Sequence, residues 1–108
     1  MAKNFVQEGK TIAITNAGTD EIVSGDPVVV GKVVAVAIAD IPAGQDGSGF
    51  TEGVFLLPKL AADAISAGVQ VYLKAGKIQL ASTDAVLAGV AWDAAPANTA
   101  IVAVKING

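Results

Sequence analysis

The residues of this chain that are capable of chemistry are few and of limited kind. The sequence contains no His, Cys or Arg, so it lacks the side chains that most often act as general bases, soft metal ligands and bidentate phosphate binders. Serine nucleophiles have no His to activate them; the serines are Ser24, Ser48, Ser66 and Ser82. We therefore expect no catalytic residue, no metal and no cofactor, and we expect that the protein is not an enzyme.

Two groups of residues nevertheless have the types needed for ion binding. Asp40, Asp46 and Glu52 lie close together in sequence and carry the oxygen ligands of a divalent cation, but their spacing matches no calcium loop. Residues 44–49 are dense in glycine, yet no Gly-Lys-Ser/Thr follows them, and Asp46 would repel a phosphate. We interpret the carboxylates as solvated side chains and residues 44–49 as a flexible surface loop.

Composition limits the remaining function classes. The chain has 108 residues, of which 53% are hydrophobic and 16% charged, with a net charge of −3. The negative charge disfavours nucleic-acid binding, and the longest low-charge run, residues 33–41, is too short for a membrane span. The apolar excess is either Ala and Gly of little consequence at a surface, or an area that contacts other subunits.

The elements that would position any site are short strands. Alternating or β-branched runs predict strands at 11–15, 28–30, 33–38, 54–57, 69–73, 78–80, 87–92 and 101–106. Only residues 58–66 have helical composition, with Pro58 at a first-turn position and Gly68 beyond the end, so we expect a short helical turn there. The predicted fold is all-β, a small sandwich or barrel, with one domain over residues 11–108.

Two features within this pattern are specific. Residues 74–77 join two alternating runs through a short Gly-containing connection, which predicts a β-hairpin. Residues 36–44 also resemble residues 90–98 at an offset of 54, and residues 22–30 resemble residues 65–73. The sequence therefore indicates two related β-units, the second carrying the hairpin as an insertion.

Candidate contact residues come from the first ten positions and from the aromatic side chains. Residues 1–10 resemble an arm that can add a strand to a partner's sheet edge; an ordinary first strand of the domain's own sheet is the alternative. The sole Trp, Trp92, is interpreted first as a core residue with its indole N–H bonded to a carbonyl. Alternatively Trp92, and likewise Tyr72, anchors an interface.

Several segments, in order along nearly the whole chain, resemble the small capsid cement or decoration proteins of tailed bacteriophages and prophages. The segments are residues 3–12, 24–31, 53–59, 67–73, 87–91 and 102–108. The resemblance implies a β-rich domain that binds the outside of the phage head and reinforces contacts between major capsid proteins. Members of this family have often carried a RecA-type recombinase label, which this sequence contradicts because it lacks a phosphate-binding loop and any Arg.

From this resemblance we expect a structural virion protein on the capsid exterior, made in the cytoplasm of the bacterial host. Its expected partners are the major capsid protein and further copies of itself, with a trimer favoured, and neither nucleic acid nor membrane. Expected capsid-contact residues are Phe5, Val6, Gln7 and Lys10, and expected oligomer contacts are Tyr72 and Trp92. The alternatives are a head fibre or tail protein, or a non-enzymatic binding module that uses Asp40, Asp46 and Glu52.

Overall fold

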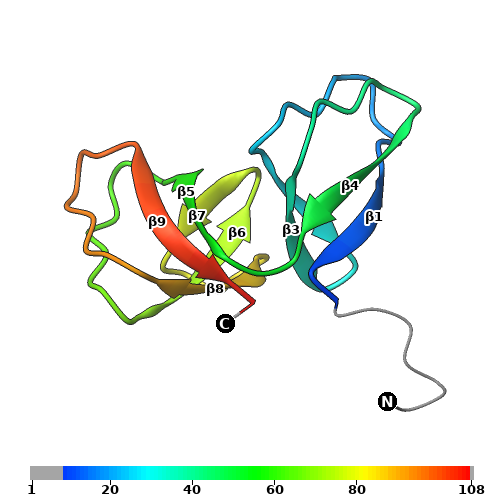
Figure 1. The fold of residues 1–108 in the computed structure, drawn as a ribbon. Coiled ribbons are helices and arrows are strands. Elements are labelled where there is room, and N and C mark those ends of the chain that lie inside the picture. Colours follow the sequence, from blue (N-terminus) through cyan, green and yellow to red (C-terminus); the bar gives the residue numbers. More distant parts are fainter. Residues whose placement is uncertain (1–8, 108) are drawn as a thin grey trace, which may run out of the picture.

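The computed structural model describes residues 9–107, and this part of the chain is built from strands, turns and loops without a helix. Nine strands form two antiparallel sheets, and the two sheets lie side by side as separate lobes (Figure 1). The strands are β1 (Thr11–Thr15), β2 (Pro27–Val30), β3 (Val33–Ala37), β4 (Asp46–Phe50), β5 (Val54–Pro58), β6 (Gln70–Lys74), β7 (Lys77–Gln79), β8 (Val86–Ala91) and β9 (Ile101–Ile106). The all-β prediction is confirmed.

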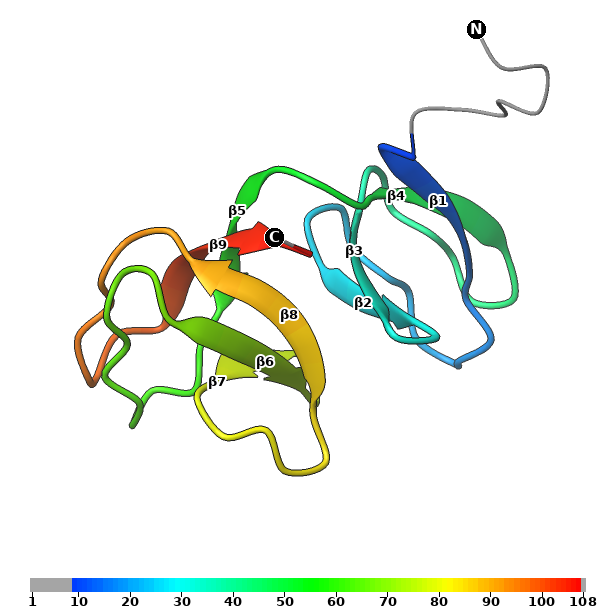
Figure 2. The ribbon, with the colours of Figure 1, turned by 90° about the horizontal axis from the view of Figure 1, so that it is seen from below.

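The first unit is a four-stranded sheet in the order β1-β4-β3-β2. The second is a five-stranded sheet in the order β5-β9-β8-β6-β7. Figure 2 shows the short link from β4 to β5 passing between the two units. In the second unit, Lys59 forms a parallel bridge with Ile78 of β7, and the Leu60 N–H donates to the Ile78 carbonyl at 2.8 Å. This bridge brings the two edges of the second sheet, at β5 and β7, together, so that the unit resembles a small barrel.

The two units are copies of one design, as the repeat in the sequence indicates. Ile22 bridges Ile41 in the first unit, and Ile65 bridges Ala95 in the second. The Gly25 N–H donates to the Ala37 carbonyl, and the Gly68 N–H donates to the Ala91 carbonyl. The strand orders agree as well, because β5, β9, β8 and β6 take the places of β1, β4, β3 and β2, and β7 is the addition. The predicted repeat and its inserted hairpin are confirmed.

Even the buried polar side chains occur at equivalent positions. Among the described residues these are Asn16 and Lys59, each directly after the first strand of its unit. Asn16 Nδ2 donates to the carbonyls of Asp20 and Ile41 at 2.8 and 2.9 Å. Lys59 Nζ donates to the carbonyls of Leu60, Ala61 and Asp63. Each side chain therefore bonds backbone carbonyls of the loop that follows it, and Asn16 also bonds Ile41, so that both buried polar groups have partners.

β3 lies between two hydrophobic cores and is buried on both faces. Ala35 and Ala37 contribute to the small core of the first unit, while Val34 and Val36 contribute to the core of the second. The Asn107 amide joins the same strand to the chain end, because its Nδ2 donates to the Val34 carbonyl at 2.8 Å. The same Nδ2 also donates to the Thr51 carbonyl, in the link between the units.

Two local predictions are wrong. Residues 58–66 form no helical turn: Pro58 ends β5 paired with Ile101, and Lys59 and Ile65 each form a β-bridge, so the backbone is held extended at both ends. Residues 44–49 are no flexible loop, since β4 runs through Asp46–Phe50 between β1 and β3. Gly47 and Gly49 are suited to this strand because a Cβ on either would lie 2.6 Å or less from an Ile side-chain carbon.

Candidate interaction surface

The polar residues singled out from the sequence do not converge on a reactive site. Among residues 9–107 no group of three or more Asp and Glu side chains is placed to hold a metal ion, so Asp40, Asp46 and Glu52 form no such cluster. Asp40 instead accepts a hydrogen bond from the Ser24 N–H at 2.8 Å. No helix in this part of the chain is able to span a membrane.

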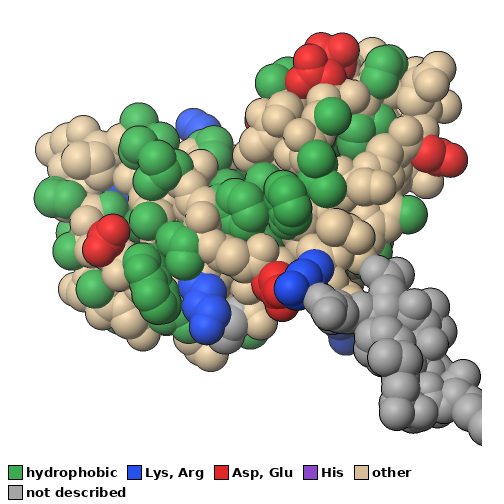
Figure 3. Space-filling model, viewed as in Figure 1, with side chains coloured by type: hydrophobic (Ala, Val, Ile, Leu, Met, Phe, Trp, Pro, Cys, Tyr) green, Lys and Arg blue, Asp and Glu red, His purple; other side chains and the backbone are tan. Residues whose placement is uncertain are grey.

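The three most exposed large apolar side chains of the second unit, together with Val54, lie on one outer face. Leu56 is 67% exposed, Trp92 55%, Ile101 53% and Val54 44%. Figure 3 shows hydrophobic side chains gathered over the part of the molecule that contains β5 and β9. We call this surface the β5–β9 face; it consists of Val54, Leu56, Trp92, Ile101 and Ala103, with Asp93 and Lys105 at its border.

The strand register explains why these side chains come together. Leu56 on β5 pairs with Ala103 on β9, and the Trp92 N–H donates to the Ala103 carbonyl at 2.8 Å. Since side chains alternate between the two faces of a strand, Val54 and Leu56 point outward while Leu57 is fully buried. On β9, Val102 and Val104 are likewise buried, and Ile101 and Lys105 are exposed. Three neighbouring chain segments thus present one continuous apolar surface.

The interpretation of Trp92 as a core residue is wrong. Trp92 lies directly after β8, where the strand leaves the core, and more than half of its side chain is exposed. Lys105 Nζ lies over the indole ring, 5.9 Å from its centroid, a distance at which a cation–π attraction is expected. The alternative interpretation, an interface anchor, remains a prediction.

An open hollow borders this face. It has a volume of about 290 Å³ and is lined by Leu56, Pro96, Thr99, Ile101 and Ala103, among others. Its wall is mostly apolar, so it is able to accept a small hydrophobic side chain from a partner.

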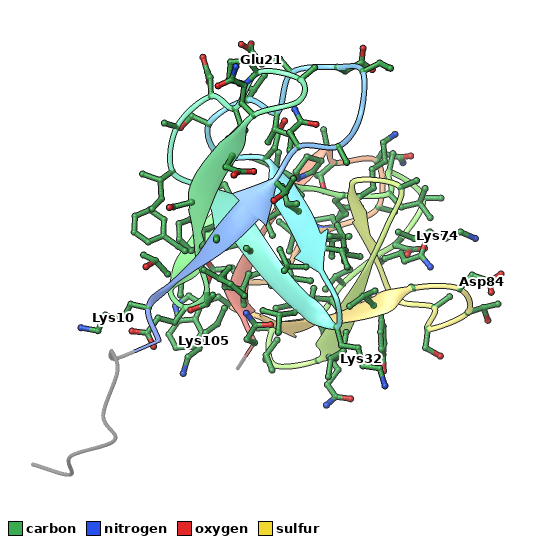
Figure 4. The ribbon with its side chains drawn as sticks, turned by 90° about the vertical axis from the view of Figure 1, so that its right-hand side faces the viewer. Lys10, Glu21, Lys32, Lys74, Asp84 and Lys105 are labelled. Atoms are coloured by element: carbon green, nitrogen blue, oxygen red, sulfur yellow. The ribbon has the colours of Figure 1, made fainter. Side chains whose placement is uncertain are left out.

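The other predicted contact residues lie elsewhere. Tyr72 is half-buried on β6, in register with Leu87 of β8, and β8 separates β6 from β9. The structure therefore does not bring Tyr72 into the same strand pair as the β5–β9 face. Phe5, Val6 and Gln7 lie outside the described residues. Lys10 is exposed at the start of the described chain, at the same end of the molecule as Lys105 and opposite Glu21 (Figure 4).

Sequence reasoning missed Leu56 and Ile101. Both lie in strands that are apolar on both faces, where alternation does not distinguish inward from outward side chains. The signal that was available is the internal repeat, because it aligns these residues with polar or small residues of the first unit.

Fold and surface together define a small, duplicated all-β protein whose distinctive feature is an exposed apolar face suited to protein contact. A family model described as phage cement protein matches residues 6–106, nearly the whole chain, so the protein belongs to the phage cement protein family. It is therefore a structural protein of the phage capsid, in a family of structural rather than catalytic proteins. No curated protein and no solved structure matches the chain.

Proposed function

We propose that this protein binds the outer surface of the phage head and stabilises the lattice of the major capsid protein. The observation that supports this most directly is the family match over residues 6–106. A protein of this role needs surfaces that contact other proteins, and the β5–β9 face exposes three large apolar side chains by more than half. Many such weak contacts, repeated around a capsid, give high avidity without a deep binding site.

In this proposal the N-terminal arm and the β-body have different roles. The arm of residues 1–10 contacts the capsid through Phe5, Val6, Gln7 and Lys10, by adding to the edge of a capsid-protein sheet. The β-body, residues 11–108, acts as one domain and forms a homo-oligomer, with a trimer favoured. The protein is made in the host cytoplasm and acts on the exterior of the virion.

The test is co-sedimentation with expanded phage heads that lack the cement protein. The wild-type protein pellets with the heads and saturates at a fixed ratio to the major capsid protein. The full-length variant Phe5→Ala/Val6→Ala loses most of this binding, because the two apolar side chains of the arm are removed.

A matched control addresses the binding-module alternative. The variant Asp40→Asn/Asp46→Asn/Glu52→Gln keeps the size of each side chain and removes three charges. We expect it to bind heads like the wild type. Failure of the wild-type protein to pellet with heads of its own phage contradicts the proposal and favours a tail or fibre role.

A further inference from the structure

The internal duplication offers a comparison for the outer face of the second unit. Positions that pair in the same way in the two units carry different residues. Thr11, Ala13 and Thr15 on β1 correspond to Val54, Leu56 and Pro58 on β5, and Asp46, Ser48 and Phe50 on β4 correspond to Ile101, Ala103 and Lys105 on β9. The first unit thus has mainly polar or small residues where the second has mainly apolar ones.

This difference separates what the fold requires from what it does not. Ala13 pairs with Ser48 just as Leu56 pairs with Ala103, and Thr15 pairs with Asp46 just as Pro58 pairs with Ile101. The same backbone therefore forms without a large apolar side chain at these positions. Exposure of Leu56 and Ile101 to water is unfavourable, and the fold does not need large apolar side chains at these positions. Exposed apolar side chains of this kind are typical of a contact surface.

The exposed apolar residues of the first unit have a partial explanation within the molecule. Phe50, which takes the place of Lys105, stacks on Phe55 of the second unit with ring centroids 5.7 Å apart. No comparable contact with the first unit covers Leu56 or Ile101, which remain 67% and 53% exposed. An apolar surface of this kind needs a partner outside the described chain.

The charges at the border of the face identify the kind of partner. Lys105 lies beside Trp92, and Asp93 follows Trp92 in the chain, so one positive and one negative charge flank the apolar centre. These two charges cancel, whereas the whole chain carries −3 and repels its own copies elsewhere. A face that carries both signs is complementary to another copy of itself, because Lys105 of one copy is able to face Asp93 of the other.

We infer that the β5–β9 face is the contact between copies of this chain, with Trp92 and Leu56 at its centre and Lys105 of one copy facing Asp93 of the next. The inference rests on the oligomer of the proposed function and assigns it a surface. It does not involve the arm, so that head binding and self-association are separable in experiments.

The sole Trp provides the measurement. Trp92 emission is followed during dilution of the full-length protein from about 100 µM to 10 nM, a span of concentrations that covers weak to tight self-association. Molar mass by light scattering is measured at the upper end. We expect a closed oligomer whose Trp92 emission shifts to longer wavelength as it dissociates. A monomer throughout this range overturns the inference.

A matched pair of variants tests the surface. Ile101→Asp introduces the residue that the first unit carries at the equivalent position, Asp46, and we expect it to weaken self-association by at least 100-fold, as hot-spot changes do. The control Val29→Asp alters a Val of the first unit that is 42% exposed and lies away from the face. We expect the control to associate like the wild type. Circular dichroism establishes that both variants are folded, and Leu56→Ala provides a milder change if Ile101→Asp is not.

Charge reversal tests the pairing between copies. Lys105→Glu and Asp93→Lys each weaken association about tenfold, since each leaves two like charges facing across the contact. The double variant restores association to within a factor of about three of the wild type. Lack of restoration contradicts the assigned arrangement of Lys105 and Asp93.

Head binding of the same variants distinguishes the inference from the proposed function. If Ile101→Asp is monomeric and still pellets with heads, though with lower avidity, both hold. If Ile101→Asp remains an oligomer but no longer binds heads, the face contacts the capsid protein and the inference is overturned. If the wild type self-associates through the face but never pellets with heads, the inference stands and the head-binding role fails.

Discussion

One pair of facing core positions carries a large and a small side chain in the first unit and the reverse in the second. This difference predicts how exchanging the two sizes changes the free energy of unfolding. In the first unit a large side chain, Ile41, faces Gly47 of β4. In the second unit the equivalent residues are Ala95 and Val102, a small side chain facing a larger one. Replacing Ile by Ala removes three carbons, and replacing Gly by Val adds three. The double variant Ile41→Ala/Gly47→Val therefore converts the first solution into the second at nearly constant volume.

The single variants are expected to be costly for different reasons. Ile41 is 2% exposed, so Ile41→Ala leaves a cavity and lowers the free energy of unfolding by about 3 kcal/mol. A Cβ on Gly47 lies 2.5 and 2.6 Å from Ile41 Cγ1 and Cδ1, so Gly47→Val overpacks the core and costs about 2–3 kcal/mol. Gly47 does not have a positive φ, and Val therefore meets no backbone penalty there.

The double variant is expected to cost less than either single change, about 1 kcal/mol, because the new side chain fills the new cavity. The coupling between the two sites is then about 4–5 kcal/mol, well above the range of independent sites. Urea unfolding followed by circular dichroism gives the three free energies. The reciprocal pair Ala95→Ile and Val102→Gly is the control and is expected to show coupling of the same sign. Additive effects, within about 0.5 kcal/mol, refute the equivalence of the two packings.

Three further predictions concern other contacts; urea unfolding measures the stability of each variant that folds, and circular dichroism shows whether Gly89→Ala folds. Asn107→Ala removes the amide that bonds the Val34 backbone and is expected to cost about 1–2 kcal/mol, whereas a change below 0.3 kcal/mol contradicts a role in joining the units. Lys59→Met keeps the apolar stem but leaves three carbonyls without their donor, for a loss of about 2 kcal/mol; an unchanged stability means that water replaces the ammonium. Gly89→Ala places a Cβ 2.0 Å from the Lys105 carbonyl oxygen at a φ of +153° and is expected to abolish folding, while Gly25→Ala, with a φ of +90° and open space around it, costs only about 1 kcal/mol.

Most of the strands were predictable because their residues are individually suited to strands. The runs around β1, β3, β5 and β9 are rich in Val, Ile and Leu, and short turns separate them. The hairpin between β6 and β7 was predictable from its Gly-containing connection, and its turn residues Ala75 and Gly76 both have positive φ. Local sequence and tertiary structure agree in these segments.

β4 was not predictable from its own composition, because Asp-Gly-Ser-Gly-Phe is typical of a loop. Its glycines are needed because the side chains of Ile41 and Ile14 approach Gly47 and Gly49 closely, a tertiary contact that the composition of β4 does not reveal. The repeat contained the missing information. With an offset of 55 in place of 54, the repeat aligns β4 with residues 101–105 of β9, whose composition predicts a strand clearly.

Recognition of the β5–β9 face as a contact surface also depends on the comparison between the two units. The sequence drew attention to Trp92 by residue type but could not show that its side chain leaves the core, since the flanking run is apolar throughout. For Leu56 and Ile101 the local pattern offered no sign of exposure, and only the comparison with the first unit did. The first unit shares the fold of the second inside the same molecule, so the two units serve as related sequences for each other. Where the two units agree, at Asn16 and Lys59 or at the bridges of Ile22 and Ile65, the shared feature serves folding. Where they differ on an exposed face, as at Asp46 and Ile101, folding does not explain the difference, and this supports the proposed contact with another protein.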